Sequence, residues 1–193
     1  GAELGVLFRD AAALERASRI RTVVLDRTGT LTQGRLRVES VAAAAGMDED
    51  SLLALAAAVE AGSEHPLGRA LVAEANRRNL AVPQATGFRA TPGRGIAAQV
   101  QGRTILVGSA AFLAAELGLD AGKLGRTQAV AGLTPVLIAA DGALIGSVGL
   151  GDTLREEARA AIAELRQLGL EPVILSGDLA APTQRVAAQL GIE

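Results

Sequence analysis

Two short apolar runs near opposite ends of the chain each finish in a polar loop, and this feature constrains the fold most. The first run, Thr22 to Leu25, ends at Asp26, and the second, Pro172 to Leu175, ends at Ser176. Such runs are typical of buried strands in parallel sheets. Because ligands of doubly wound α/β sheets bind beyond the carboxyl ends of the strands, we expect both loops to line one crevice and both chain ends to form one domain.

The segments beside these runs show helical spacing of apolar residues. We expect a helix from Asp10 to Arg19, before the first run. Before the second run, Thr153 to Glu156 has the pattern of a capping box, which predicts a helix that begins there and ends at Gly169. A last helix is expected from Pro182 to Leu190.

The sequence between the two ends changes character. Apolar spacing predicts helices around Leu52 to Val59 and from Pro66 to about Arg78. Gln101-Gly102 and Asp141-Gly142 each join two apolar runs, which predicts two β-hairpins. Helices combined with antiparallel strands indicate an inserted α+β domain. The expected division is an α/β domain of residues 1–33 and 151–193 and an α+β domain of residues 34–150.

Composition and charge exclude several kinds of partner. The chain has 19 Lys and Arg against 21 Asp and Glu, and its net charge of -2 offers no basic footprint for nucleic acid. It has no Cys, which excludes disulfides and thiolate metal sites. Charged residues, Gly or Pro interrupt every apolar run before the roughly 18 to 20 residues that cross a membrane. We therefore expect a soluble, monomeric fragment.

The run from Asp26 to Thr32, Asp-Arg-Thr-Gly-Thr-Leu-Thr, carries the strongest chemical signal. An Asp at a strand end, followed by hydroxyl residues and Gly, is placed to attack phosphorus while the loop holds phosphate oxygens. The Asp26 carboxylate would be the nucleophile and the intermediate an aspartyl phosphate. Mg²⁺ would offset the repulsion between the two anions, and we expect Asp26 and Thr28 to hold it.

This run resembles the phosphorylation motif Asp-Lys-Thr-Gly-Thr-Leu-Thr of the P-type ATPases, members of the haloacid dehalogenase superfamily. Arg27 stands at the Lys position, which keeps the charge but changes the hydrogen-bonding geometry. The resemblance implies a haloacid dehalogenase-like phosphorylation domain with an inserted nucleotide-binding domain. Phosphatases of the superfamily usually have a second Asp where Thr28 stands. Without that proton donor, the acyl phosphate should persist.

The Ser-Glu-His-Pro-Leu run from Ser63 to Leu67 resembles a motif of the heavy-metal subfamily of these ATPases. The resemblance implies that His65 contacts the nucleotide. Pro66 favours the first helical position, which would place His65 at a helix N-terminus that attracts anions. Taken alone, a single His is more often a capping or buried structural residue.

Other positions match the nucleotide site of the same subfamily. The resemblance assigns Glu60 to this site, although a helical Glu alone would be a solvated charge. Gly93-Arg94-Gly95-Ile96 resembles the Gly-x-Gly element near the adenine, where missing Cβ atoms would let a flat ring lie against the backbone. Gly108 begins another loop in the matching region, and Ser109 after it stands where some family members have Asn. The alternative is that Ser109 only caps the helix containing Phe112. The expected nucleotide-site residues are Glu60, Ser63, Glu64, His65, Gly93, Gly95, Ile96 and Gly108.

Two C-terminal segments also resemble family elements. Ser176-Gly177-Asp178 resembles the Thr-Gly-Asp loop, whose hydroxyl and acidic groups suit a phosphate and its Mg²⁺; the alternative is a helix-capping turn. The segment from Asp152 to Arg155 resembles the point where the chain re-enters the phosphorylation domain, and we interpret Asp152 as a hinge and cap. After the Thr-Gly-Asp loop the family continues with a phosphate-binding Lys and a Gly-Asp-Gly-x-Asn-Asp segment, and neither is found between Asp178 and Glu193. We therefore expect ATP binding but little phosphorylation.

The implied parent is an ATP-driven heavy-metal transporter on the cytoplasmic side of the cell membrane. Its transmembrane helices and actuator domain, in the same polypeptide, are the implied partners. The Ser63-Glu64-His65-Pro66 run favours copper or silver over zinc or cadmium. The alternatives are a free-standing phosphatase of the same superfamily and a nucleotide-binding module without catalysis.

Overall fold

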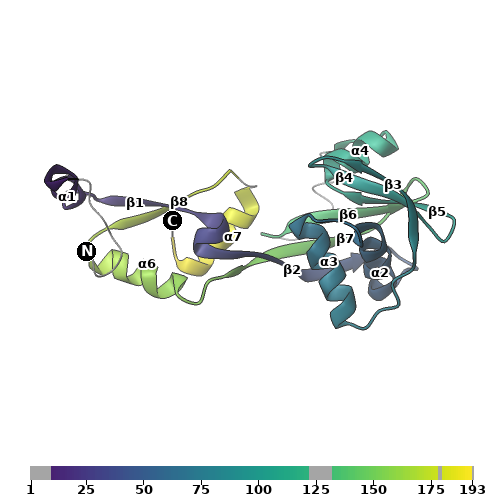
Figure 1. Ribbon diagram of the computed structural model, residues 1–193, viewed down its shortest axis with the longest axis horizontal. Coiled ribbons are helices and arrows are strands. Elements are labelled where there is room, and N and C mark those ends of the chain that lie inside the picture. Colours follow the sequence, from purple (N-terminus) through teal and green to yellow (C-terminus); the bar gives the residue numbers. More distant parts are fainter. Residues whose placement is uncertain (1–9, 122–131, 178–179, 193) are drawn as a thin grey trace.

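The computed structural model describes residues 10–121, 132–177 and 180–192, which form two lobes joined by two long strands (Figure 1). The described α-helices are α1 (Ala11–Ala17), α2 (Glu49–Glu60), α3 (Pro66–Arg77), α4 (Ala110–Leu117), α6 (Ala158–Gln167) and α7 (Ala180–Leu190). The strands are β1 (Thr22–Asp26), β2 (Thr32–Ala43), β3 (Ala85–Thr91), β4 (Gly95–Val100), β5 (Arg103–Gly108), β6 (Thr134–Ala140), β7 (Ala143–Leu154) and β8 (Glu171–Leu175).

One lobe, called the β1–β8 lobe below, unites opposite ends of the chain. Its strands β1 and β8 pair in parallel, with Asp26 opposite Leu175. This pairing confirms the expectation that the two chain ends pack together. Beside the sheet lies a small core of buried apolar side chains from the turn after β1 and from α6, α7 and the residues just after α7: Leu31, Ala158, Ile162, Val186, Leu190 and Ile192.

The other lobe, called the insert lobe, is built on an antiparallel sheet with the strand order β2-β7-β6-β5-β4-β3. Because side chains alternate along a strand, its two faces belong to different cores. Ile105 and Val107 of β5 pack in the core that includes α2 and α3. Leu106, between them, packs with Phe112 and Leu113 of α4. Helices therefore cover both faces of this sheet, α4 on the face opposite to α2 and α3 (Figure 1).

The two expected hairpins are confirmed. Gln101 and Gly102 have φ values of +52° and +78° in the turn between β4 and β5. Asp141 and Gly142, between β6 and β7, have φ values of +49° and +87°. Positive φ at both central residues is the geometry of the turn that suits the twist of paired strands.

Strands β2 and β7 connect the lobes. They pair from Ala43 opposite Gly146 in the insert lobe to Thr32 opposite Leu154 beside the β1–β8 lobe (Figure 1). Their pairing is irregular between Thr32 and Leu36. A change in the angle between the lobes therefore requires this two-stranded ribbon to bend or twist.

The expected start of the helix before β8 is wrong. Thr153 and Leu154 belong to β7, and α6 begins only at Ala158, after the N-cap residue Glu157. The Glu157 side chain makes no capping hydrogen bond. Pairing of Leu154 with Thr32 extends β7 through the capping-box pattern, so tertiary pairing outweighs the local signal.

No helix in the described ranges combines the length and the apolar character needed to cross a bilayer.

Candidate functional site

The structure brings Asp26 and the Ser176 loop to the same edge of the β1–β8 sheet. Asp26 is the exposed last residue of β1, in extended conformation with φ −71° and ψ 148°. Its strand partner is Leu175, so Ser176 and Gly177 continue the chain directly beside it. Asp178 lies outside the described residues. Both polar loops thus leave the carboxyl end of a parallel sheet, which is where such sheets bind ligands.

The turn after Asp26, residues Arg27–Leu31, is called the Asp26 loop below. Gly29 has φ +80° there, a backbone conformation that residues with a Cβ rarely adopt. Arg27 is only 7% exposed, and its Nη2 donates a hydrogen bond of 3.3 Å to Thr28 Oγ1. Leu31 is buried among the side chains of α6 and α7. The loop is therefore anchored at both ends, while Asp26, Thr28 and Gly29 remain exposed.

Asp152 of β7 holds the far end of the Asp26 loop. Its Oδ2 accepts a hydrogen bond of 2.5 Å from the hydroxyl of Thr32, a fully buried residue. Its Oδ1 accepts a hydrogen bond of 2.9 Å from the Arg35 backbone N–H. The hinge interpretation agrees with this geometry, but the capping interpretation is wrong because Asp152 lies within β7, before Glu157, the residue that caps α6.

Arg155 also holds the loop, and sequence reasoning gave this residue no role. Its Nη2 donates a hydrogen bond of 2.9 Å to the Gly29 carbonyl oxygen, and its backbone N–H donates one of 3.0 Å to the Leu31 carbonyl oxygen. Asp152 and Arg155 thus clamp the loop from the segment where the chain returns to the β1–β8 lobe. An Asp followed three residues later by an Arg at this return was the available signal.

His65 caps α3 in the insert lobe. Its Nδ1 accepts a hydrogen bond of 3.3 Å from the Leu67 N–H, and Pro66 is the first helical residue as expected. An accepting Nδ1 places the proton of the neutral ring on Nε2, which makes Nε2 a hydrogen-bond donor. The capping role and a ligand role are therefore compatible in this exposed side chain.

Glu60, the last residue of α2, is buried, so the interpretation of it as a solvated charge is wrong. It is 5% exposed, and burial raises the pKa of its carboxyl group, while a hydrogen bond from Ser63 and, when the imidazole is protonated, the charge of His65 oppose that rise. Within the described part of the chain, its Oε2 has no hydrogen-bond partner. A cavity of about 240 Å³ lies beside it, and Arg69 and Asn76 also line this cavity.

Gly68 provides the space for the Glu60 carboxyl group. A Cβ at position 68 would lie 2.3 Å from Glu60 Oε2 and 2.9 Å from Ser63 Oγ. Because such distances are far inside van der Waals contact, only glycine fits there. The run Ser63 to Leu67 and Gly68 together place a carboxyl group and an imidazole at the junction of α2 and α3, with Glu64 exposed between them.

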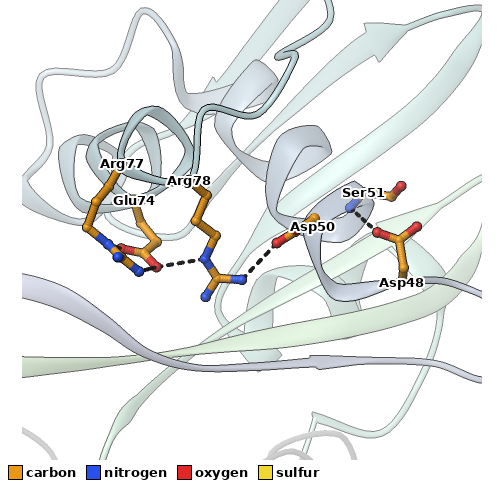
Figure 2. A network of polar contacts seen from close by, with 6 residues as sticks. All are labelled: Asp48, Asp50, Ser51, Glu74, Arg77 and Arg78. Atoms are coloured by element: carbon orange, nitrogen blue, oxygen red, sulfur yellow. Dashed lines mark hydrogen bonds and ion pairs between the residues drawn. The ribbon is translucent and has the colours of Figure 1, made fainter.

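An ion-pair network holds the opposite ends of these two helices (Figure 2). The Glu74 carboxylate accepts hydrogen bonds of 2.7 Å from both Arg77 Nε and Nη2 and of 2.8 Å from Arg78 Nε. Arg78 Nη1 donates one of 2.9 Å to Asp50 Oδ1 of α2. Hydrogen bonds from Arg77 and then Arg78 lower the pKa of Glu74 to about 2. The network fixes α3 against α2 and so supports the geometry at Glu60 and His65.

Two different structural features explain why glycine stands at the positions expected near the adenine. Gly93 has φ +69° in the turn between β3 and β4, with open space around it in the described structure. Gly95 and Gly108 face each other across β4 and β5, and a Cβ at either position would collide with the ring of Phe112 and with nearby backbone atoms. The flat ring that these glycines admit is thus an internal one. Ile96, beside Gly95, is half-buried.

The expected site residues fall into two groups. Asp26, Thr28, Ser176 and Gly177 lie in the β1–β8 lobe, whereas Glu60, His65 and the glycines lie in the insert lobe, which is built on a different sheet. A cavity of about 340 Å³ lies between the lobes, and Arg27, Asp152 and Arg185 are among the residues that line it. On its wall, Arg185 of α7 forms an ion pair of 2.5 Å with Glu39 of β2.

Similar proteins agree on one family. The sequence profile of the haloacid dehalogenase-like hydrolases matches residues 20–193. The chain is 40% identical over its whole length to the probable copper-exporting P-type ATPase V of Mycobacterium tuberculosis, and 43% identical to a zinc/cadmium/lead-transporting P-type ATPase of Shigella sonnei. In both cases it spans 26% of the relative's length.

A solved structure shows the same fold. The whole chain superposes on 31% of a zinc-transporting PIB-type ATPase crystallised in its E2.Pi state, with a TM-score of 0.77 and 42% identity. The chain therefore belongs to the haloacid dehalogenase-like hydrolase family, and its relatives within that family are heavy-metal P-type ATPases.

Proposed function

We propose that this chain is the ATP-binding and phosphorylation part of an ATP-driven heavy-metal cation transporter, and that Asp26 forms its aspartyl-phosphate intermediate. One observation carries the proposal: an exposed carboxylate ends β1 directly beside the end of β8, and a clamped loop with a positive-φ glycine follows it. The match of the whole chain to P-type ATPases supports the same reaction.

The proposed reaction is a phosphoryl transfer without proton transfer. An Asp26 carboxylate oxygen attacks the γ-phosphorus of ATP, the bond from that phosphorus to the β,γ-bridging oxygen breaks, and ADP leaves with the bonding electrons. Ser176 and the N–H groups of the Asp26 loop are suited to hold the oxygens of the transferred group. Thr28 has no titratable proton, so it gives water no general base and the acyl phosphate persists.

The residues at Asp26 fit a magnesium ion. Mg²⁺ keeps several waters and is bound by one or two carboxylates together with substrate phosphates, and Asp26 is an exposed carboxylate with the oxygen atoms of Thr28 two residues away. We assign Asp26 and Thr28 to it and expect Ser176, Gly177 and Asp178 to border it. When bound, the ion neutralises charge on the transferred phosphoryl group.

ATP is proposed to bind in the insert lobe. The buried Glu60 carboxyl, with an oxygen that no described residue satisfies, can accept from or donate to a base, and the Nε2–H of His65 is a donor. The other residues assigned to this site are Ser63, Glu64, Gly93, Gly95, Ile96 and Gly108. Because this group and Asp26 lie in different lobes, closure at the β2–β7 ribbon would bring the γ-phosphate to Asp26.

The transported ion is proposed to be copper or silver, and the chain to lie on the cytoplasmic side of the membrane. The support for this ion is the Ser63 to Pro66 run; the relatives' names include both copper and zinc/cadmium/lead. The parent transporter's ATP hydrolysis should rise with Cu⁺ or Ag⁺ and not with Zn²⁺ or Cd²⁺. Stimulation by Zn²⁺ or Cd²⁺ and not by Cu⁺ or Ag⁺ would contradict the proposed ion but not the proposed phosphoryl transfer.

Two measurements on this chain test the proposal. In a titration with ATP, the backbone amide resonances of Glu60, His65 and Gly95 should shift, whereas those of Ile162 in the β1–β8 lobe should not. Unchanged resonances at all three positions would refute nucleotide binding by the insert lobe. With a phosphate monoester as substrate, the chain should release no more than trace phosphate. Rapid turnover would identify a phosphatase instead.

A further inference from the structure

Gly95 and Gly108 are glycines for lack of space and not for backbone conformation. Neither has the positive φ found at Gly93, so alanine could adopt the backbone angles of both. A Cβ at Gly95, however, would lie 2.4 Å from Cδ1 of Phe112 and 2.6 Å from the Val107 carbonyl oxygen. A Cβ at Gly108 would lie 2.6 Å from the Arg94 carbonyl oxygen, 2.7 Å from Gly95 Cα and 2.8 Å from the same Phe112 atom. The two facing glycines form a seat for one phenyl ring.

The helix that carries Phe112 is tied to the turn before β4. Ser109 caps α4, because its Oγ accepts a hydrogen bond of 3.2 Å from the Phe112 N–H. The Ser109 N–H in turn donates one of 2.9 Å to the Arg94 carbonyl oxygen, and the Arg94 N–H donates one of 3.0 Å to the Thr91 carbonyl oxygen. The turn from Thr91 to Gly95 is thus bonded to α4 through its backbone and packed against α4 through Phe112, which is 2% exposed.

We propose that Phe112 is a positioning residue of the nucleotide site. Its ring, seated on Gly95 and Gly108, fixes the height of the Thr91–Gly95 turn above the sheet and thereby sets the affinity for ATP. This inference rests on the proposed binding of ATP by the insert lobe. It assigns the requirement for glycine at position 95 to internal packing against Phe112 and the Val107 carbonyl oxygen. It leaves Gly93, whose positive φ shapes the turn, as the glycine that the ligand approaches.

The two explanations of Gly95 predict different double variants. If Gly95 must be small because a nucleotide lies on it, Gly95→Ala blocks ATP whatever residue stands at position 112. If Gly95 must be small because Phe112 lies on it, removal of the ring relieves the nearest contacts of the new methyl group and leaves only its contact with the Val107 carbonyl oxygen. A substitution of Phe112 should then restore part of the binding that Gly95→Ala removes.

The test is a set of ATP dissociation constants measured by calorimetry on the 193-residue chain. Gly95→Ala should weaken binding about tenfold or more, and Phe112→Ala should weaken it less. The double variant Gly95→Ala/Phe112→Ala should bind ATP at least about threefold more tightly than Gly95→Ala, because the contacts with the ring are gone. Leu113→Ala is the matched control, because Leu113 is a fully buried neighbour in α4 and in the same core cluster but does not lie on the glycines. Gly95→Ala/Leu113→Ala should bind no better than Gly95→Ala.

A double variant that binds ATP as weakly as Gly95→Ala would overturn the role of Phe112. A wild-type chain that binds no ATP would overturn the proposed function itself, so the two failures are distinguishable. Should Phe112→Ala fail to fold, Phe112→Val takes its place in both variants. The chain has only three aromatic residues, all Phe, so ring resonances provide a second measurement without ligand: Gly95→Ala should shift those of Phe112, and unshifted resonances would contradict the seat.

Discussion

Asp152 accepts a 2.5 Å hydrogen bond from Thr32, and this contact joins the two strands of the ribbon at the point where they meet the Asp26 loop. Thr32 directly follows the Asp26 loop, and Asp152 precedes by three residues the Arg155 that binds Gly29 in that loop. Rotation of the insert lobe about the ribbon would therefore pull on the loop beside Asp26. The hinge and the proposed nucleophile are mechanically connected.

Asp152→Asn should impair phosphorylation more than ATP binding. Asparagine has one acceptor oxygen, which can still accept from the Arg35 N–H, but its amide NH2 would face Thr32 Oγ1 and can only donate. The charge-assisted bond from the Thr32 hydroxyl is therefore lost, and the cost in unfolding free energy should be about 1–3 kcal/mol. In the parent transporter, the amount of phosphoenzyme should fall. The ATP dissociation constant should stay within about twofold of the wild type, because changes at distant sites act roughly independently. Glu156→Gln, an exposed neighbour, is the control and should change neither quantity. Equal losses in both quantities would argue against a hinge role.

Gly68→Ala should displace Glu60. The added Cβ would lie 2.3 Å from Glu60 Oε2, so the variant should lose about 1–3 kcal/mol of stability and bind ATP more weakly. Gly62→Ala is the matched control, since the described structure leaves open space around that position and its φ is not positive. Denaturant unfolding and calorimetry measure the two effects. Normal ATP affinity in folded Gly68→Ala would show that the position of Glu60 does not matter for binding.

Ionisation of the Glu60 carboxyl group should lower the free energy of unfolding. Burial raises the pKa of this group in the folded chain above its ordinary value of 4.5, so the folded state holds the proton more tightly than the unfolded state does. The contribution of Glu60 to stability is therefore complete below pH 4.5 and is lost as the pH rises through the folded pKa. Glu60→Gln should unfold at a higher urea concentration than the wild type near pH 7, yet bind ATP more weakly. A stability difference between wild type and Glu60→Gln that does not change as the pH rises from 4.5 to neutral would contradict the raised pKa.

Glu74 should behave in the opposite way. Its pKa is lowered from 4.5 to about 2, so its ion pairs stabilise the fold above pH 4.5 and are lost as the pH falls toward 2. Glu74→Gln should cost about 1–2 kcal/mol at pH 7, because the Glu74 side chain is only 11% exposed and its bonds to Arg77 and Arg78 are charge-assisted. Urea unfolding should show this difference shrinking between pH 4.5 and 2. A difference that is constant across this range would rule out the ion pairs as its cause.

Local patterns in the sequence predicted the elements whose boundaries are set locally. The helix beginning at Pro66 and the turn at Asp141-Gly142 form as expected. The run ending at Asp26 forms the expected strand, but the expectation of burial is wrong, because no residue of β1 is buried and Val24 is 58% exposed in a sheet of only two described strands. Strand β2 was missed although Leu36 and Val38 alternate with charged residues, because a shift in pairing between Val38 and Ser40 interrupts the alternation. The late start of α6 depends on the pairing of Leu154 with Thr32, 122 positions apart in the numbering, which no local pattern reveals.

The proposed sites divide in the same way. Asp26 could be found because its chemistry is contained in seven consecutive residues. The clamp by Asp152 and Arg155 depends on contacts across more than 100 residues, such as Thr32 with Asp152 at a separation of 120. The ring of Phe112 on Gly95 depends on the register of β4 with β5 and on where α4 crosses them. From the sequence alone, the space beside Gly95 was therefore assigned to the ring of a bound nucleotide.

The central claim is that Asp26 accepts the γ-phosphate of ATP, and acid-quenched labelling of the full-length parent transporter tests it most directly. With ATP labelled at the γ-phosphate, the wild type should form a protein-bound label that survives acid and is released by hydroxylamine, as an acyl phosphate must be. Asp26→Asn should carry no label, whereas Asp120→Asn, an exposed aspartate of the insert lobe, should be labelled like the wild type. Undiminished label on Asp26→Asn would contradict the account.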